Sequence, residues 1–252
     1  MENPYVIVKG DKIEIINDFL DLSNRSIKDL SEIEGIEKAT NLKWLMLTGN
    51  LLTEIKLLDN LTNLLTLEIG NNQIKEIKGL EKLKNLQVLN LAVNKIKEIK
   101  GLPLDNLQEL GLGQNSIEEI KGLDNLSKLK KLNIMQNKLK EIKGLDKLVE
   151  LESLTLTDNK ISEIKALDNL KNLMELNLDL NQIKEIKGLD NLTNLKYLNL
   201  AANKIKELQG LENLDNLESL YIYDNPIKNK KELEIVENGA QEAVKYCKEK
   251  KK

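Results

Sequence analysis

The sequence predicts an α/β solenoid, in which one short unit repeats along the chain and stacks into a single parallel sheet. Three observations lead to this fold class. Asparagine recurs at a nearly fixed interval through most of the 252 residues. Each of these asparagines follows a Leu-x-Leu or Leu-x-Ile segment and precedes further Ile or Leu residues at constant spacing. The chain is 40% hydrophobic but only 3% aromatic, which fits a core made of stacked small aliphatic units.

The repeated frame is L-x-L/I-x-x-N-x-I/L-x-x-I/L, and successive asparagines are 22 residues apart except for one interval of 21. The short interval falls between Asn94 and Asn115, where the unit contains Pro103. The recurring asparagines are Asn50, Asn72, Asn94, Asn115, Asn137, Asn159, Asn181, Asn203 and Asn225.

A tenth, degenerate copy precedes these nine. Leu20 and Leu22 fit the frame, but Arg25 stands in place of asparagine. Three extra residues separate this copy from the one that begins at Trp44.

Each part of the frame has a predicted structural role. The two Leu residues of a short strand point inward, and strands of successive copies pair about 4.8 Å apart. The asparagine lies where the chain turns into the core, and its side chain is predicted to hydrogen-bond backbone groups of adjacent coils. The GLDNL segments then predict a short 3₁₀ or irregular turn on the opposite side, capped by Asp or Glu after Gly.

This frame resembles the 22-residue leucine-rich repeats of the phosphatase-regulator type, which also occur in bacterial internalins. The resemblance covers Leu20 to Pro226. It implies a curved parallel sheet on a concave face and short turns on a convex face. It also implies two functions, either the regulatory subunit of a phosphatase or a cell-surface adhesin of internalin type.

Both ends of a solenoid need a cap, because a terminal coil exposes its core. We predict an N-terminal hairpin cap over 1–19, a solenoid of about ten repeats over 20–228, and a helical cap over 229–252. In the first cap, Tyr5–Lys9 and Lys12–Ile16 flank a Gly10-Asp11 turn. In the second, Asn229 to Glu232 has the spacing of an N-cap with its reciprocal glutamate. One apolar stripe is expected to follow, with Gly239 as a kink or break: Leu233, Val236, Ala240, Val244 and Cys247.

Composition argues against several function classes. The net charge is −3 with no histidine and one cysteine, so we expect no disulfide, metal site, cofactor or catalytic residue, and no nucleic-acid partner. The I-K-E-I-K segments place Lys and Glu in adjacent rows whose charges cancel. The start of the chain does not resemble a secretory signal and no long apolar run occurs, so we expect a cytoplasmic monomer that does not enter a membrane.

The outward positions beside the strand leucines carry the chain's distinctive side chains. Five of its seven aromatic residues fall on these thirty positions, where fewer than one is expected by chance. Acidic residues outnumber the one lysine there by five to one. The predicted partner-binding residues on this face are Trp44, Met46, Glu68, Glu109, Lys131, Glu175, Asp179, Tyr197, Tyr221 and Tyr223.

Two alternatives stay open for these positions. The N-terminal hairpin is able to cover Phe19 and Trp44, and Tyr221 and Tyr223 are able to pack on the C-terminal helix. Glu175 and Asp179, four residues apart, form the nearest candidate for acid–base catalysis, but a charged contact with a basic partner explains them better. The sequence therefore predicts a protein-interaction scaffold whose partner has a basic or mixed surface.

Overall fold

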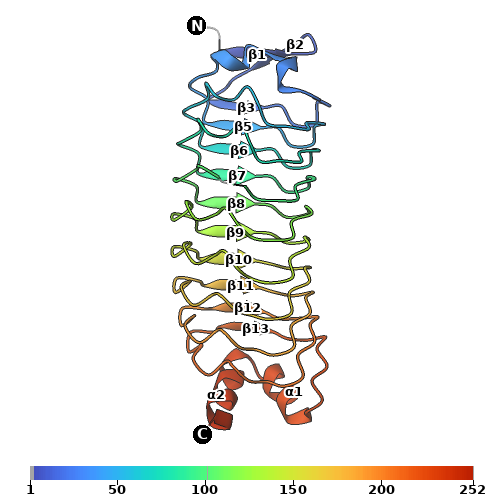
Figure 1. Ribbon diagram of the computed structural model, residues 1–252, viewed down its shortest axis with the longest axis vertical. Coiled ribbons are helices and arrows are strands. Elements are labelled where there is room, and N and C mark those ends of the chain that lie inside the picture. The colour runs from blue at the N-terminus through green and yellow to red at the C-terminus, as the bar shows by residue number, and fades with distance from the viewer. Residues whose placement is uncertain (1–2, 101, 252) are drawn as a thin grey trace.

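The computed structural model describes residues 3–100 and 102–251, and Figure 1 shows its short strands stacked one after another along the long axis. Met1, Glu2, Gly101 and Lys252 lie outside the described residues, so the ends of both predicted caps do too. Ten strands form one parallel sheet in chain order: β3 (Phe19–Asp21), β5 (Trp44–Met46), β6 (Thr66–Glu68), β7 (Val88–Asn90), β8 (Glu109–Gly111), β9 (Lys131–Asn133), β10 (Ser153–Thr155), β11 (Glu175–Asn177), β12 (Tyr197–Asn199) and β13 (Ser219–Tyr221). The predicted solenoid is confirmed.

The central leucine of each strand faces the core and sets the register. Leu154 pairs with Leu132 on one side and Leu176 on the other, and all three are at most 1% exposed. Because side chains alternate across a strand, the residues on either side of each central leucine point away from the core. The inward residues form one continuous cluster from the first cap to the last helix.

The predicted asparagine ladder is present. The Asn137 Oδ1 atom accepts a hydrogen bond from the Ile117 N–H at 2.9 Å, in the preceding coil. Its Nδ2 atom donates to the Leu112 and Met135 carbonyls, both at 3.0 Å. The other eight ladder asparagines each accept from a backbone N–H of the coil before their own.

The residue before each ladder asparagine adopts a left-handed backbone conformation, and the sequence pattern did not predict this. From Gly49 to Asp224, the residue before every ladder asparagine has a positive φ. Val93 (φ 57°) and Leu180 (φ 54°) adopt it despite their bulk, a conformation uncommon for such residues. The hydrogen bonds of the following asparagine hold this backbone in place.

On the opposite side of the solenoid, each coil returns through tight turns. The Leu61 N–H donates to the Leu58 carbonyl at 2.9 Å, and the Leu64 N–H donates to the Leu61 carbonyl at 3.0 Å. A second row of asparagines links these turns, as when Asn85 Nδ2 donates to the Thr62 carbonyl at 2.9 Å. This second row was not predicted, although the asparagines recur at the same interval.

The N-terminal cap contains the predicted hairpin and a third strand. Strands β1 (Tyr5–Val8) and β2 (Asp11–Glu14) are antiparallel, and β4 (Ile33–Glu34) pairs with the free edge of β1. Two 3₁₀ helices flank β4, η1 (Leu30–Glu32) and η2 (Ile36–Lys38). Val6 and Val8 are 1% and 2% exposed, so the hairpin closes the core. The extra residues of the degenerate copy fall in the stretch that supplies this third strand.

The C-terminal cap consists of two helices, α1 (Lys230–Glu237) and α2 (Ala240–Lys251), and they are separated at Gly239 (φ 108°), where a kink or break was predicted. The cap differs from the prediction in two ways. Leu233 is 43% exposed, so the predicted single apolar stripe is wrong at its first position, and Ala243 is buried instead. The chain bends at Gly239, which turns α1 and α2 in different directions and breaks the helical periodicity.

The second difference concerns Glu232. Asn229 does cap α1 by accepting from the Lys231 N–H at 3.1 Å, but Glu232 does not reciprocate. Its side chain is 1% exposed and accepts hydrogen bonds from the Leu208 N–H at 2.9 Å, the Lys250 ammonium at 3.0 Å and the Tyr246 hydroxyl at 3.1 Å. Glu232 therefore joins both helices to the coil that contains Leu208.

We predict that Asn137→Ala destabilises the protein by about 1–3 kcal/mol, because buried backbone groups lose their hydrogen-bond partners. Urea unfolding at pH 7 measures the change. Lys138→Ala, at the neighbouring exposed position, is the matched control and is expected to change little. Equal midpoints for the two variants would refute the role of the ladder.

Removal of residues 229–252 is predicted to cause self-association, because the apolar end of the last coil becomes exposed to water. Light scattering of the shortened chain during a thermal melt tests this. A monomer with an unchanged melting curve would show that the two helices do not act as a cap.

Glu232→Gln is predicted to lower stability at pH 7 and to lose this effect in acid. Burial alone raises the pKa of Glu232, but hydrogen bonds from Leu208, Lys250 and Tyr246 outweigh it and hold the pKa below 4.5. A lowered pKa in the folded state stabilises the protein above about pH 4.5 and ceases to do so as the pH falls through the folded-state value. Melting midpoints of both proteins between pH 7 and about pH 3.5 should converge toward the acid end; a pH-independent gap would contradict this.

Candidate functional site

We call the outward side of the ten-stranded sheet the strand face. Each coil contributes three residues to it, which lie before, between and after its two inward strand residues. All ten predicted binding residues lie on it. They separate into three groups. Trp44 and Met46 on β5 form an aromatic group together with Phe19 on the adjacent β3, a charged group lies on β6, β8 and β9, and a tyrosine–acid group lies around β11, β12 and β13.

The aromatic group lies at the N-terminal end. Phe19 and Trp44 pair in register on β3 and β5 and are 38% and 36% exposed. The hairpin therefore leaves both side chains accessible, which decides the first open alternative. Met46 shares β5 with Trp44 and is partly buried.

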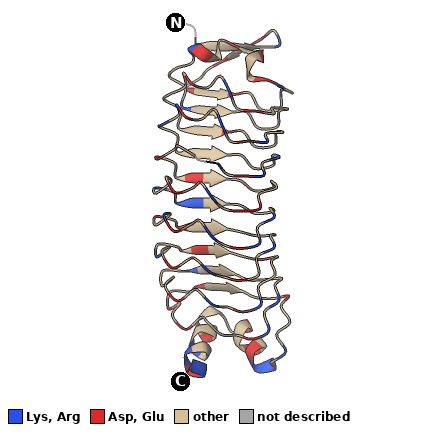
Figure 2. Ribbon diagram, in the orientation of Figure 1, with Lys and Arg blue, Asp and Glu red and all other residues tan. Residues whose placement is uncertain are grey.

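The charged group is largely self-neutralised. Lys131 Nζ lies 2.8 Å from Glu109 Oε1 on the adjacent strand, and this hydrogen bond raises the pKa of Lys131. Figure 2 shows the acidic residue on β8 next to the basic residue on β9, and a second acidic strand residue on β11. The lysine that the sequence analysis placed on this face is thus already paired with Glu109.

The tyrosine–acid group comprises Glu175, Asp179, Tyr197, Tyr221 and Tyr223. The Tyr197 and Tyr221 rings have centroids 5.4 Å apart with planes tilted by 43°. Tyr221 and Tyr223 are 42% and 61% exposed, so the C-terminal helices do not cover them and the second open alternative is also decided. Burial raises the pKa of Tyr197, and the nearby Tyr221 and the Asp179 carboxylate add to this effect.

The two acids of this group have few partners. Glu175 Oε2 accepts a hydrogen bond from Ser153 Oγ at 2.9 Å. Within residues 3–100 and 102–251, no lysine or arginine forms an ion pair with Glu175 or Asp179. The Asp179 Oδ1 and Thr157 Oγ1 atoms are buried and lack any hydrogen-bond partner, which is unusual for buried polar atoms.

The lysine–glutamate rows on the flank behave as the sequence predicted. Lys143 lies 2.8 Å from Glu141 in its own coil and 3.7 Å from Glu119 in the preceding one. Glu141 also lies 3.0 Å from Lys165 in the next coil. Charges therefore cancel along this surface, and exposed pairs of this kind contribute little stability.

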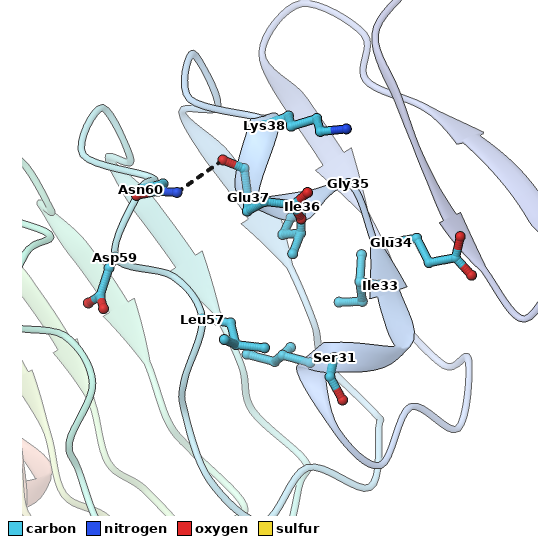
Figure 3. A pocket seen from close by; sticks show the side chains of 11 residues that line it. Ser31, Ile33, Glu34, Gly35, Ile36, Glu37, Lys38, Leu57, Asp59 and Asn60 are labelled. Atoms are coloured by element: carbon cyan, nitrogen blue, oxygen red, sulfur yellow. Dashed lines mark hydrogen bonds between the residues drawn. The ribbon is translucent and has the colours of Figure 1, made fainter.

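Two hollows lie away from the strand face. One, of about 660 Å³, lies between the inserted N-terminal segment and the next coil, where Asn60 Nδ2 donates to the Glu37 carbonyl at 3.3 Å (Figure 3). The other, also about 660 Å³, is lined mainly by lysines of two flank segments, 75–78 and 95–100. Among the described residues, no three Cys, Asp or Glu side chains are placed to hold a metal ion. No described helix combines the length and apolar character needed to cross a bilayer.

Family models place the chain among known repeats. A model described as leucine-rich repeats in two copies matches residues 40–82, 62–104, 105–147 and 193–234, and a second leucine-rich repeat model matches 150–205. These matches cover well over half of the chain. The chain belongs to the leucine-rich repeat family.

Solved structures of bacterial leucine-rich repeat proteins are similar throughout the solenoid. Internalin C2 of Listeria monocytogenes is 33% identical with a TM-score of 0.66, over 75% of this chain and 85% of that one. Internalin inlF of the same organism is 29% identical with a TM-score of 0.53, over 86% and 77%. The Leptospira interrogans leucine-rich repeat protein LIC12759 is 29% identical with a TM-score of 0.65, over 82% and 60%. Comparison with curated protein sequences gives no significant match.

Proposed function

We propose that the chain is a protein-interaction scaffold that binds a partner protein on its strand face. The observation that carries this proposal is the accessible tyrosine–acid group, since Tyr221 and Tyr223 remain 42% and 61% exposed. Tyrosine and tryptophan are enriched among residues that dominate binding energies. Membership of the leucine-rich repeat family supports the same class of function.

The charge of this face determines the kind of partner. Among the described residues, Glu175 and Asp179 form no ion pair, whereas Lys131 pairs with Glu109. A partner surface that is basic or mixed therefore complements the C-terminal half of the face, while Phe19, Trp44 and Met46 offer apolar contacts at the other end. Such charges act mainly on association rate and specificity.

The location and exact role of the scaffold belong to the same proposal. We favour a monomer acting in the cytoplasm, with phosphatase regulation as one role that the repeat frame implies. A cell-surface adhesin of internalin type is the second candidate, and the 33% identity to internalin C2 favours it over phosphatase regulation. Fractionation of cells that express the chain, with detection by antibody, distinguishes the two locations.

Tyr221→Ala with Tyr223→Ala, and separately Glu175→Lys with Asp179→Lys, are predicted to abolish capture of the partner while the fold is retained. Replacing the tyrosines removes contact area that contributes about 2 kcal/mol or more to binding if they are central to the interface. Affinity capture at equal folded concentration, followed by mass spectrometry, compares each variant with the unmodified chain.

The matched control is Lys184→Ala with Lys187→Ala on the flank, where Lys187 lies 3.6 Å from Glu185 within the self-cancelling rows. This variant is expected to capture the same partner as the unmodified chain. If the flank variant loses the partner while both strand-face variants retain it, the partner binds the flank and the proposed surface is wrong.

A further inference from the structure

A hollow on the flank of the solenoid departs from the cancellation of lysine and glutamate charges. It has a volume of about 660 Å³ and lies between the segments 75–78 and 95–100, which follow β6 and β7. Ile77 and two glutamates line it together with five lysines, which are Lys75, Lys78, Lys95, Lys97 and Lys100. Five positive and two negative charges leave an excess of +3 around this volume.

The two glutamates of the hollow are already engaged by lysines of their own coils. Glu76 Oε2 lies 3.6 Å from Lys78 Nζ, and Glu98 Oε2 lies 3.0 Å from Lys100 Nζ. The hydrogen bond from Lys100 and the charges of Lys100 and Lys121 lower the pKa of Glu98. The carboxylates therefore neutralise Lys78 and Lys100 but not the rest of the lining.

The other three lysines of the hollow have no carboxylate partner. Among the residues that the structure describes, Lys75, Lys95 and Lys97 form no ion pair. Lys95 Nζ donates a hydrogen bond to the neutral Gln73 Oε1 atom at 2.9 Å. Lys75 and Lys97 occupy the same repeat position in successive coils, whose strands lie about 4.8 Å apart, so their like charges repel. An anion between them would remove this repulsion.

The hollow also reaches the apolar core. Ile77 is 8% exposed, whereas the Ile or Leu residue at the same position of each of the six following coils is at most 2% exposed. The lysine side chains add apolar methylene stems to this surface. The hollow therefore offers apolar contact area as well as positive charge.

An equivalent place farther along the flank lacks both features. There a hollow of about 100 Å³ is lined by two lysines, two glutamates and Ser162, so its charges balance. Ser162 and Lys184 stand at the repeat positions that Lys75 and Lys97 occupy in the larger hollow. The repeat by itself therefore creates neither the volume nor the excess of charge.

These features indicate one class of ligand. Small-molecule sites are concave, measure about 300–1,000 Å³ and are mostly apolar with a few polar groups. A cleft lined by one sign of charge attracts counter-ions, and a lysine ammonium binds phosphate as a point charge. An inorganic anion would leave the apolar lining unused, and a neutral apolar molecule would leave three ammonium groups without a counter-charge.

We propose that this hollow binds a small organic phosphate, whose phosphate group pairs with Lys75, Lys95 and Lys97 and whose apolar body packs against Ile77. The site lies away from the strand face, so it adds a small-molecule ligand to the proposed protein contact and does not depend on it.

The test uses the full isotope-labelled chain and three probes that separate charge from apolar surface. Naphthyl phosphate carries both, inorganic phosphate carries only the charge, and naphthol carries only the apolar rings. Backbone amide chemical shifts are followed as each probe is titrated at neutral pH and low salt. Naphthyl phosphate is expected to give saturable shifts at residues 75–78 and 95–100, and the other two probes to bind at least about tenfold more weakly.

Lys75→Gln with Lys97→Gln is expected to weaken binding of naphthyl phosphate about tenfold or more, because two charged partners of the phosphate are lost. The melting midpoint of this variant is not expected to fall, since neither lysine forms an ion pair. The matched control is Lys140→Gln with Lys184→Gln. These two lysines stand at the same repeat position in other coils, form no ion pair among the described residues and lie outside the hollow. The control changes the net charge equally and is expected to leave the affinity unchanged.

Three results would each overturn the proposal. The first is the absence of saturable shifts at residues 75–78 and 95–100 with naphthyl phosphate. The second is binding of inorganic phosphate or naphthol as tight as that of naphthyl phosphate, since one half of the site would then be irrelevant. The third is equal affinity of the two double variants for naphthyl phosphate, which would reduce the effect to net charge.

Discussion

The structure depends on satisfying backbone hydrogen bonds where each coil turns into the buried apolar core. Strand pairing accounts for only three residues per coil, and the next residues have to leave the sheet and enter the apolar interior. One asparagine in each coil meets this need, because its amide provides an acceptor and two donors at the same place. Asn137, for example, reaches backbone atoms of its own coil and of the coil before it. The ladder therefore both closes a turn and fixes the spacing between coils.

That constraint explains why the position before each ladder asparagine has a positive φ, and why large side chains are tolerated there. Glycine or asparagine suits a positive φ, yet Val93 and Leu180 adopt it with side chains that are 40% and 51% exposed. This backbone strain is tolerated because the following asparagine makes several buried hydrogen bonds, and losing them would destabilise the fold more. Identity at this position is thus free to vary, whereas the asparagine after it is not.

The same division of labour makes the strand face available for function. The leucines and isoleucines inside the coils, the two asparagine rows and the two caps supply most of the stability. Among the outward strand residues, Asp21, Asn90 and Asn133 each accept a hydrogen bond from the N–H two residues later. Tyr221 and Tyr223 instead stay exposed. Glu232 shows how the caps complete this arrangement, since one buried carboxylate joins α1, α2 and the Leu208 coil. Outward residues differ between coils, and tyrosines and acidic residues occur together toward the C-terminal end.

The sequence by itself determined the repeat, the parallel sheet, the ladder and the identity of every outward side chain, because periods of 2 within a strand and 22 between coils leave no freedom in which face a residue occupies. The sequence did not determine which coils the irregular segments of the two caps contact. The third cap strand β4, the burial of Glu232 and the exposure of Leu233 arise from contacts with coils distant in sequence, for which no local pattern exists. Only the tertiary structure decided that Trp44, Tyr221 and Tyr223 stay exposed and that the Asp179 Oδ1 atom lacks a hydrogen-bond partner, since exposure and hydrogen bonding depend on how the caps and adjacent coils pack.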